Sequence, residues 1–213
     1  MKKCVIFDMD GVLCDSEPFI CKAAILMFAE KGLQVREEDF IPFVGAGENR
    51  YIGGVAEKYG LPLDIEEAKT RTYAIYCEII KGRLKPMNGV YDFVQSCRRK
   101  GIRLAVASSA DLVKVRANLE EIGLPFESFD TVINGLEIEH KKPAPDIFLL
   151  AARRLNIDPG DCLVIEDAVN GIEAAKNAGM SALGILSSFT EEELCKADYH
   201  ARDLSCVPPE ALE

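Results

Sequence analysis

Two acidic residues, Asp8 and Asp10, stand two positions apart in the segment VIFDMDGVLCDSE, directly after the apolar run at 4–7. Carboxylates this close repel each other, and burying either of them without a partner has a large free-energy cost. A bound cation relieves both problems, and carboxylate oxygens are ligands that Mg²⁺ prefers. The pair therefore makes a magnesium ion the first candidate ligand of this segment.

Polar residues also follow three later apolar runs of the chain. They are Ser108 and Ser109 in RLAVASS, Lys141 and Lys142 in EHKKPAPD shortly after TVING, and Glu166 and Asp167 in CLVIED. In open α/β sheets, ligands bind beyond the carboxyl ends of the strands, so these side chains are expected at one edge together with the first two acids. A metal ion, a lysine and a hydroxyl group in one place can hold a phosphoryl group.

Each of these groups also has an ordinary structural explanation. Acids are common in turns after strands, the serines could cap the next helix, and the lysine could be a solvated loop residue. The pair Glu166 and Asp167 could interact with a helix dipole. The functional interpretation depends on all four groups occurring in order, each near the end of a strand.

The elements that would position these residues follow from the apolar patterns. The runs at 4–8, 103–109, 131–135, 162–167 and 181–186 are continuous rather than alternating, which is typical of strands buried on both faces of a parallel sheet. Helical patterns lie between them, among them one with Leu112, Val115, Leu119 and Ile122 on its apolar face and Asp111 as its N-cap. This alternation predicts a doubly wound α/β fold. From about residue 18 to residue 86 only helical patterns occur, which predicts a helical insert after the first strand. The tail at 197–213 has no clear pattern.

Composition limits the classes of function. The net charge of −10 and the lack of a Lys/Arg run argue against nucleic-acid or membrane-surface binding. No signal peptide and no stretch long enough to span a membrane is evident. The eight cysteines form no CxxC pair and only two histidines are present, so we expect reduced thiols in a cytoplasmic protein rather than a zinc site. A monomer is the default expectation.

Four segments in this order, DMDGVLCDSE, VASS, KPAPDIF and VIEDAVNGIEAAKNAGM, resemble the sequence motifs of the haloacid dehalogenase (HAD) superfamily. Within it they resemble the branch of phosphatases and β-phosphoglucomutase-like enzymes with a helical cap. The resemblance implies a Rossmann-like core domain at 1–16 and 87–213 and a cap domain at 17–86 that selects substrates.

The resemblance also implies roles for individual residues. Asp8 would be the nucleophile that forms an aspartyl-phosphate, Asp10 the general acid/base, Ser108 a hydrogen-bond donor to the phosphoryl oxygens, and Lys142 their positive partner. Mg²⁺ would be bound by the Asp8 carboxylate, the Asp10 backbone carbonyl and Asp167, with Glu166 beside them. Candidate substrate-binding residues are Gly11 and Ser109 in the core, and Gly47, Glu48 and Arg50 in the cap loop VGAGENR at 44–50.

The expected activity is a Mg²⁺-dependent phosphatase acting on a small phosphorylated metabolite such as a sugar phosphate. The alternative is a phosphoryl-transfer mutase, but β-phosphoglucomutases keep a histidine early in the cap, where Ile20 stands in SEPFICKAAI. Dehalogenase chemistry is disfavoured because the second acid and the metal ligands are present, and phosphonatase chemistry requires a Schiff-base lysine from the cap. A non-catalytic module with this fold is also disfavoured, since the nucleophile, the acid/base, the lysine and the metal-binding aspartate are all retained.

Overall fold

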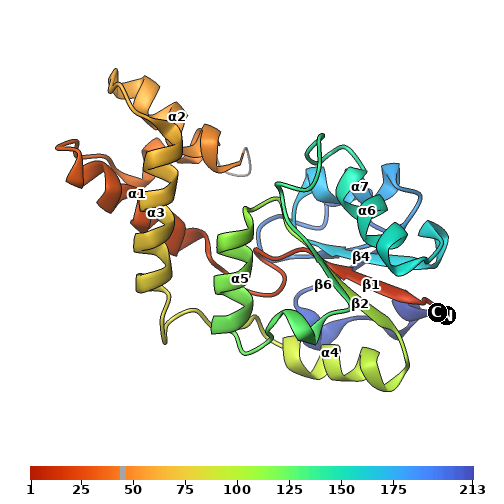
Figure 1. Ribbon diagram of the computed structural model, residues 1–213. Helices are drawn as coiled ribbons and strands as arrows, with labels where there is room; N and C mark the ends of the chain where they lie inside the picture. The colour runs from red at the N-terminus through yellow and green to blue at the C-terminus, as the bar shows by residue number, and fades with distance from the viewer. Residues whose placement is uncertain (44–46) are drawn as a thin grey trace. The chain divides into compact units, whose positions relative to one another are not determined.

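A computed structural model describes residues 1–43 and 47–213 (Figure 1). The chain divides into two compact units, one formed by Met1–Asp15 with Lys85–Glu213 and the other by Ser16–Leu84. We call the first unit the core and the second unit the cap.

The core is built on one sheet of six parallel strands in the order β3-β2-β1-β4-β5-β6. The strands are β1 Cys4–Phe7, β2 Arg103–Ala107, β3 Thr131–Ile133, β4 Cys162–Glu166, β5 Ser181–Ile185 and β6 Tyr199–Ala201. The first strand lies in the middle, and the chain leaves it to β2 and β3 on one side and to β4, β5 and β6 on the other. The order therefore reverses between β1 and β4, which is where doubly wound sheets bind ligands.

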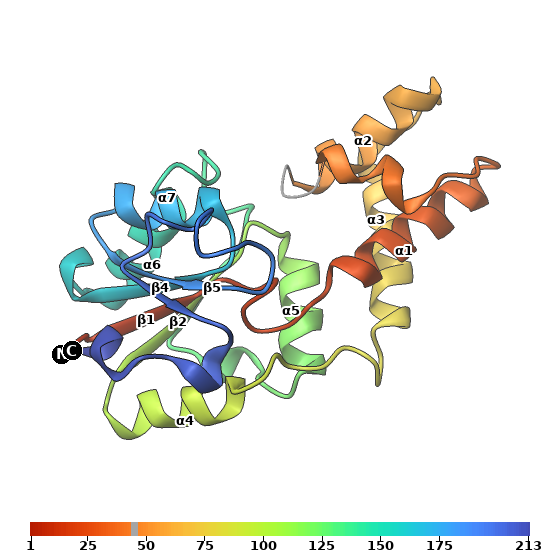
Figure 2. The same ribbon diagram turned by 180° about the vertical axis from the view of Figure 1, so that it is seen from behind.

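The core also contains four α-helices. They are α4 Val90–Arg99, α5 Leu112–Glu121, α6 Asp146–Leu155 and α7 Val169–Asn177. The helices α6 and α7 lie on one face and α4 on the other (Figures 1 and 2). The α/β fold predicted from the apolar runs is confirmed, with β6 as an additional strand in the unassigned tail.

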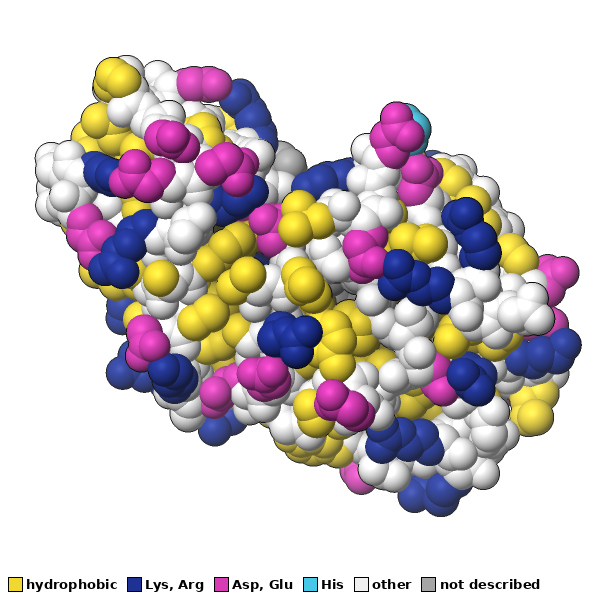
Figure 3. Space-filling view, in the orientation of Figure 1, with side chains coloured by type: hydrophobic (Ala, Val, Ile, Leu, Met, Phe, Trp, Pro, Cys, Tyr) yellow, Lys and Arg dark blue, Asp and Glu magenta, His cyan; other side chains and the backbone are white. Residues whose placement is uncertain are grey.

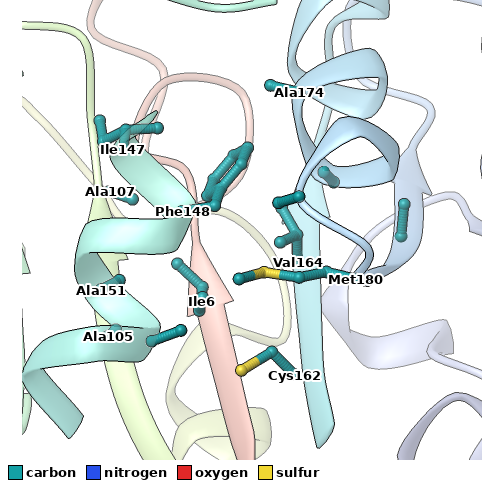
Figure 4. Close-up of a cluster of buried hydrophobic side chains, with 14 of the residues drawn as sticks. Ile6, Ala105, Ala107, Ile147, Phe148, Ala151, Cys162, Val164, Ala174 and Met180 are labelled. Carbon is teal, nitrogen blue, oxygen red and sulfur yellow. The ribbon is translucent and has the colours of Figure 1, made fainter. Parts of the chain in front are cut away.

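A cluster of buried side chains joins α6 and α7 to the sheet (Figure 4). Phe148 of α6 lies between Ile6 of β1 and Val164 of β4, and Ile147 lies beside Ala107 of β2. On the opposite face Phe7 makes an edge-on contact with Phe93 of α4, with 6.0 Å between the ring centroids. Fully burying side chains of this size stabilises the fold by about 1.5–3 kcal/mol each. This packing therefore stabilises the sheet that carries the loops after its strands.

One sequence expectation about α5 is wrong. Leu112 was expected on its buried face, but 38% of this residue is exposed. The buried face consists of Lys114, Val115, Asn118 and Leu119, and at 100° per residue Leu112 lies at the margin of that face. Asp111 does precede the helix as its N-cap residue.

The described part of the cap contains three α-helices, in agreement with the helical insert that the sequence predicts. They are α1 Glu17–Glu30, α2 Glu48–Tyr59 and α3 Ile65–Ile79, with two short 3-10 turns at Glu37–Asp39 and Ile41–Phe43. The helices α1 and α3 pack against each other, and Phe40 stacks between Phe28 and Tyr51 at centroid distances of 6.1 and 4.8 Å. The cap therefore has an apolar core of its own.

Charged side chains of both signs are interspersed on the face shown in Figure 3. Several form exposed ion pairs, such as Lys31 with Glu67 at 2.7 Å and Arg71 with Glu30 at 2.6 Å in the cap. Exposed pairs contribute about 0–1 kcal/mol each, so the apolar clusters carry most of the stability. In the part of the chain that the structure describes, no helix has the length and apolar character needed to cross a membrane.

Candidate active site

The carboxyl ends of β1 and β4 bring three acidic residues together in the core. Phe7 pairs with Ile165 in the parallel ladder, and the Asp8 amide donates to the Ile165 carbonyl at 2.9 Å. Asp8, the residue after β1, therefore lies beside Glu166, the last residue of β4, and close to Asp167, which begins the next loop. All three residues are buried.

Lys142 reaches this acidic group from the loop that precedes α6. Its Nζ donates hydrogen bonds to Asp8 Oδ1 and, at 2.7 Å, to Glu166 Oε1. Only 5% of the Lys142 side chain is exposed. The neighbouring Lys141 is exposed. Of the two lysines in EHKKPAPD, the structure thus places Lys142 against the expected nucleophile.

Glu166 is held on both of its oxygens. Oε1 accepts from Lys142, and Oε2 accepts from the backbone amides of Asp167 and Ala168, each at 2.9 Å. Gly171 of α7 passes so close that a Cβ there would lie 1.9 Å from Glu166 Oε1. This geometry suits Glu166 to positioning Lys142. Glycine is unfavourable inside a helix, so a glycine within a helical pattern, such as Gly171, can indicate that another group packs closely against the helix.

The loop after β1 is a tight turn that fixes Asp10 and Gly11. The Gly11 amide donates to the Cys14 carbonyl at 2.8 Å, and Gly11 has a φ of +74°. Asp10 Oδ2 accepts a hydrogen bond from Lys114 Nζ of α5 at 2.9 Å. The sequence reasoning missed Lys114, although a lysine and an asparagine at positions 114 and 118 interrupt the apolar face of that helix.

Two serines after β5 also belong to this edge and were missed. Ser188 Oγ donates to Asp167 Oδ2 at 2.5 Å, and Ser187 Oγ donates to the Gly11 carbonyl at 2.7 Å. They directly follow the apolar run SALGIL. The change from apolar to polar residues at the end of this fifth run is the same signal that marks the first four strands, and it could have found them.

Ser108 and Ser109 follow β2, as expected. Ser108 is buried, and its Oγ accepts from the Ala110 amide at 3.2 Å. The backbone of Ser109 lies against Gly135, where a Cβ would be 2.1 Å from the Ser109 carbonyl oxygen. Because Asp111 is the N-cap residue of α5, neither serine occupies that position.

The cap candidates lie at the start of α2. Gly47 is its N-cap residue with a φ of +85°, and Glu48 is its first residue. Arg50 pairs with Glu57 at 2.7 Å, and its guanidinium lies 5.0 Å from the centroid of the Phe43 ring. Residues 44–46 of the loop fall outside the described residues. A role of Gly47, Glu48 or Arg50 in substrate binding stays a prediction.

The buried acids carry more negative charge than Lys142 neutralises. Burial, together with the charges of Glu166 and Asp167, raises the pKa of Asp8 to about 8 even though Lys142 acts in the opposite direction. Burial and the Glu166 charge raise the pKa of Asp167 to about 7, against the hydrogen bond from Ser188. Burial lowers the pKa of Lys142, but the charges of Asp8 and Glu166 outweigh burial and raise it overall. A second cation at this place would relieve the remaining repulsion.

The donor set fits Mg²⁺ as that second cation. Within residues 1–43 and 47–213, no three side chains of Asp, Glu, His or Cys form a ready metal-binding group. The expected ligand set needs only two such side chains, because it combines the carboxylates of Asp8 and Asp167 with the backbone carbonyl of Asp10. Mg²⁺ in phosphoryl-transfer sites is commonly held by one or two carboxylates, with water and substrate phosphate completing the shell.

Replacing Gly11 by alanine is expected to damage this arrangement. The added Cβ would lie 2.0 Å from Asp167 Oδ2, in a residue whose positive φ already disfavours a side chain. Because a displacement of about 1 Å can reduce a rate about 10²-fold, we expect at least that loss of phosphate release. Gly101→Ala is the matched control, with a φ of +72° and nothing within 4 Å of its Cβ. It should lower the free energy of unfolding by about 1–2 kcal/mol and leave activity unchanged. Equal activities of the two variants would contradict the expected close approach.

Magnesium should stabilise the protein more at high pH than at low pH. The pKa values of about 8 for Asp8 and about 7 for Asp167 lie above the ordinary value of 3.8, so the folded protein binds more protons than the unfolded chain over this range. The free energy of unfolding of the metal-free protein therefore falls as the pH rises from about 5 to about 8. Protons compete with Mg²⁺ for the same carboxylates, so the rise in Tm between EDTA and excess MgCl₂ should be larger at about pH 8 than at about pH 6. Equal shifts at both pH values would contradict the assignment of these two acids.

Comparison with known proteins agrees with the fold and the motifs. The family model of the haloacid dehalogenase-like hydrolases matches residues 2–179. The chain therefore belongs to the haloacid dehalogenase-like hydrolases, as its four motifs predicted. Among its relatives is the phosphorylated carbohydrates phosphatase of Thermotoga maritima, 32% identical over 98% of this chain and 95% of that protein. The crystal structure of CbbY from Rhodobacter sphaeroides in complex with phosphate superposes with a TM-score of 0.88 at 29% identity, covering 96% of both chains.

A further relative is much longer than this chain. The chloroplast protein SUPPRESSOR OF QUENCHING 1 of Arabidopsis thaliana is 42% identical over 88% of this chain, which corresponds to 18% of that protein. The shared part is thus less than a fifth of the length of that protein.

Proposed function

We propose that this chain is a Mg²⁺-dependent phosphatase that hydrolyses small phosphorylated sugars through an aspartyl-phosphate on Asp8. The observation that carries the proposal is the contact of one buried lysine, Lys142, with both Asp8 and Glu166, beside the third buried acid Asp167. A carboxylate can approach a phosphate dianion only where positive charge offsets the repulsion between them.

In the first half of the reaction, an Asp8 carboxylate oxygen attacks phosphorus in line with the leaving group. The bond between phosphorus and Asp8 forms while the bond to the sugar oxygen breaks, and Asp10 donates its proton to that oxygen. Lys142 and the Ser108 hydroxyl bind the phosphoryl oxygens. The ion, held by Asp8, Asp167 and the Asp10 carbonyl, would supply positive charge to the phosphoryl group.

In the second half, Asp10 removes a proton from water. The resulting hydroxide attacks phosphorus and displaces Asp8, which releases inorganic phosphate and restores the starting carboxylate. Asp10 is protonated again and ready for the next leaving group. The roles of acid and base therefore alternate on a single residue.

The substrate class is inferred from relatives of nearly full coverage. The name of the Thermotoga relative assigns it phosphorylated carbohydrates, and CbbY from Rhodobacter sphaeroides has also been crystallised with xylulose-(1,5)bisphosphate, at 28% identity to this chain. The mutase alternative is disfavoured because Ile20, a buried residue of α1, stands where β-phosphoglucomutases keep a histidine.

The test is phosphate release from a panel of sugar phosphates that includes fructose 1-phosphate, glucose 6-phosphate and β-glucose 1-phosphate, with Mg²⁺ and with EDTA. We expect Mg²⁺-dependent release from at least one of them. Conversion of β-glucose 1-phosphate to glucose 6-phosphate with little free phosphate would instead establish a mutase. No turnover of any sugar phosphate would refute the proposed substrate class.

We also infer a reducing compartment, with the cytoplasm as the proposed location. All eight cysteines are free thiols. Reduced thiols are the usual state of cysteines inside cells.

A further inference from the structure

A second buried lysine lies in the core, and the proposed mechanism does not use it. Lys114 belongs to α5, and only 3% of its side chain is exposed. Lysine is almost never fully buried unless it is paired, because removing an ammonium group from water has a high free-energy cost. Its partner is Asp10, whose Oδ2 is 2.9 Å from Lys114 Nζ. The residues are 104 positions apart, so this contact is a product of the fold.

The two ends of Asp10 are held by different means. Its backbone belongs to the turn in which Gly11 bonds to Cys14 and in which Asp10 and Cys14 form a β-bridge. Its carboxylate is held by Lys114. The Asp10 side chain is 26% exposed, compared with 12% for Asp8. Asp10 is therefore fixed at one oxygen while it stays more accessible than the nucleophile.

The two buried lysines form hydrogen bonds with different acidic residues. Lys142 contacts Asp8 and Glu166, the pair next to the phosphoryl group, whereas Lys114 contacts the residue that moves the proton. We propose that Lys114 is a positioning residue that orients the Asp10 carboxylate toward the oxygen of the leaving group, an inference that rests on the proposed phosphatase function. Lys114 acts through Asp10 and has no contact with the phosphoryl group in this proposal.

This role has a kinetic signature that depends on the leaving group. A sugar alkoxide needs a proton from Asp10 when it leaves, while p-nitrophenolate is stable as an anion and needs little assistance. The ratio kcat/KM covers the reaction up to release of the leaving group. Because a positioned general acid contributes about 10²–10⁴-fold, Lys114→Met should lower kcat/KM for the best sugar phosphate at least about 10²-fold. For p-nitrophenyl phosphate we expect Lys114→Met to lower kcat/KM less than about tenfold. With the sugar phosphate, Lys114→Arg should keep a higher kcat/KM than Lys114→Met, because arginine retains the positive charge.

A double-mutant cycle separates this role from a structural one. If Lys114 acts through Asp10, then Lys114→Met should cause no further loss of kcat/KM for the sugar phosphate in an Asp10→Asn background. Calorimetric titration with inorganic phosphate and Mg²⁺ gives a readout independent of turnover, and the affinity of Lys114→Met should stay within about twofold of the unsubstituted protein. Lys141→Met, at an exposed lysine, controls for loss of a positive charge.

The outcomes are distinct. A large loss on the sugar phosphate, a small loss on p-nitrophenyl phosphate and no further loss in the Asp10→Asn background would support the inference. Equal losses on both substrates, additive losses in the cycle, or a gain in activity would overturn it while the phosphatase function stands. Absence of phosphate release from either substrate by the unsubstituted protein would overturn the proposed function, and with it this inference.

Discussion

Asp8→Asn is expected to abolish phosphate release, with a loss of at least about 10⁴-fold in kcat, because a carboxamide cannot form the aspartyl-phosphate. The substitution is nearly isosteric and removes a buried negative charge. Since burial raises the pKa of Asp8, the folded state tolerates that charge poorly. The variant should therefore be at least as stable as the unsubstituted protein in EDTA. Release of inorganic phosphate from the best sugar phosphate, measured with the Tm, checks both expectations.

Asp15→Asn is the matched control for this prediction. It changes the same residue type in the same motif, but Asp15 is exposed. We expect its activity to stay within about twofold, because surface substitutions away from special features usually change stability by less than about 0.5 kcal/mol. Substantial turnover by Asp8→Asn would rule out Asp8 as the nucleophile. A folded Asp8→Asn protein that still fulfilled the cellular role would favour a non-catalytic module.

Lys142→Met should reduce both activity and stability. Its ammonium group contacts Asp8 and Glu166, and removing one partner of a buried ion pair typically costs about 3–5 kcal/mol. The same charge stabilises the phosphoryl group in the proposed transition state, and loss of one such interaction lowers kcat about 10²–10³-fold. Denaturant unfolding with and without Mg²⁺, together with steady-state kinetics, would measure the two effects separately.

Lys141→Met provides the comparison for this loss. The two lysines are adjacent in sequence, but Lys141 is exposed and its substitution should change neither quantity measurably. If Lys142→Met kept its activity at a temperature where it is folded, the proposed role of Lys142 at the phosphoryl group would be wrong. A loss of stability without a loss of activity would assign Lys142 a structural role only.

The rule that ligands gather at strand ends predicted where several residues of the candidate site lie. It placed Asp8, Ser108, Glu166 and Asp167 at one edge because continuous apolar runs mark parallel strands reliably. Lys142 was also found, since it lies on a loop between two such runs. These residues share a signal that a single sequence carries, which is a change from apolar to polar residues at the end of a short run.

Other features could not be predicted in this way. The strand β6 has only three residues, Tyr199–Ala201, and is too short for a periodic pattern. The contact of Lys114 with Asp10 depends on how a helix is rotated about its axis, and a small change in rotation also explains the exposed Leu112. Candidate residues in the cap depend on loop geometry, for which apolar periodicity gives no information.

The position of β1 in the sheet has a consequence for how the chain folds during synthesis. This strand is made first, yet it is central, and it pairs with β2 and β4 through residues about 100 and about 160 positions later. Until those segments leave the ribosome, an apolar strand that ends in an acidic pair has neither neighbour. Contacts this far apart in sequence form slowly, because closing long loops has an entropic cost. The nascent chain therefore exposes the edges of β1 until β2 and β4 have been made, and a fragment that stops before β4 would retain an unpaired, aggregation-prone edge beside Asp8.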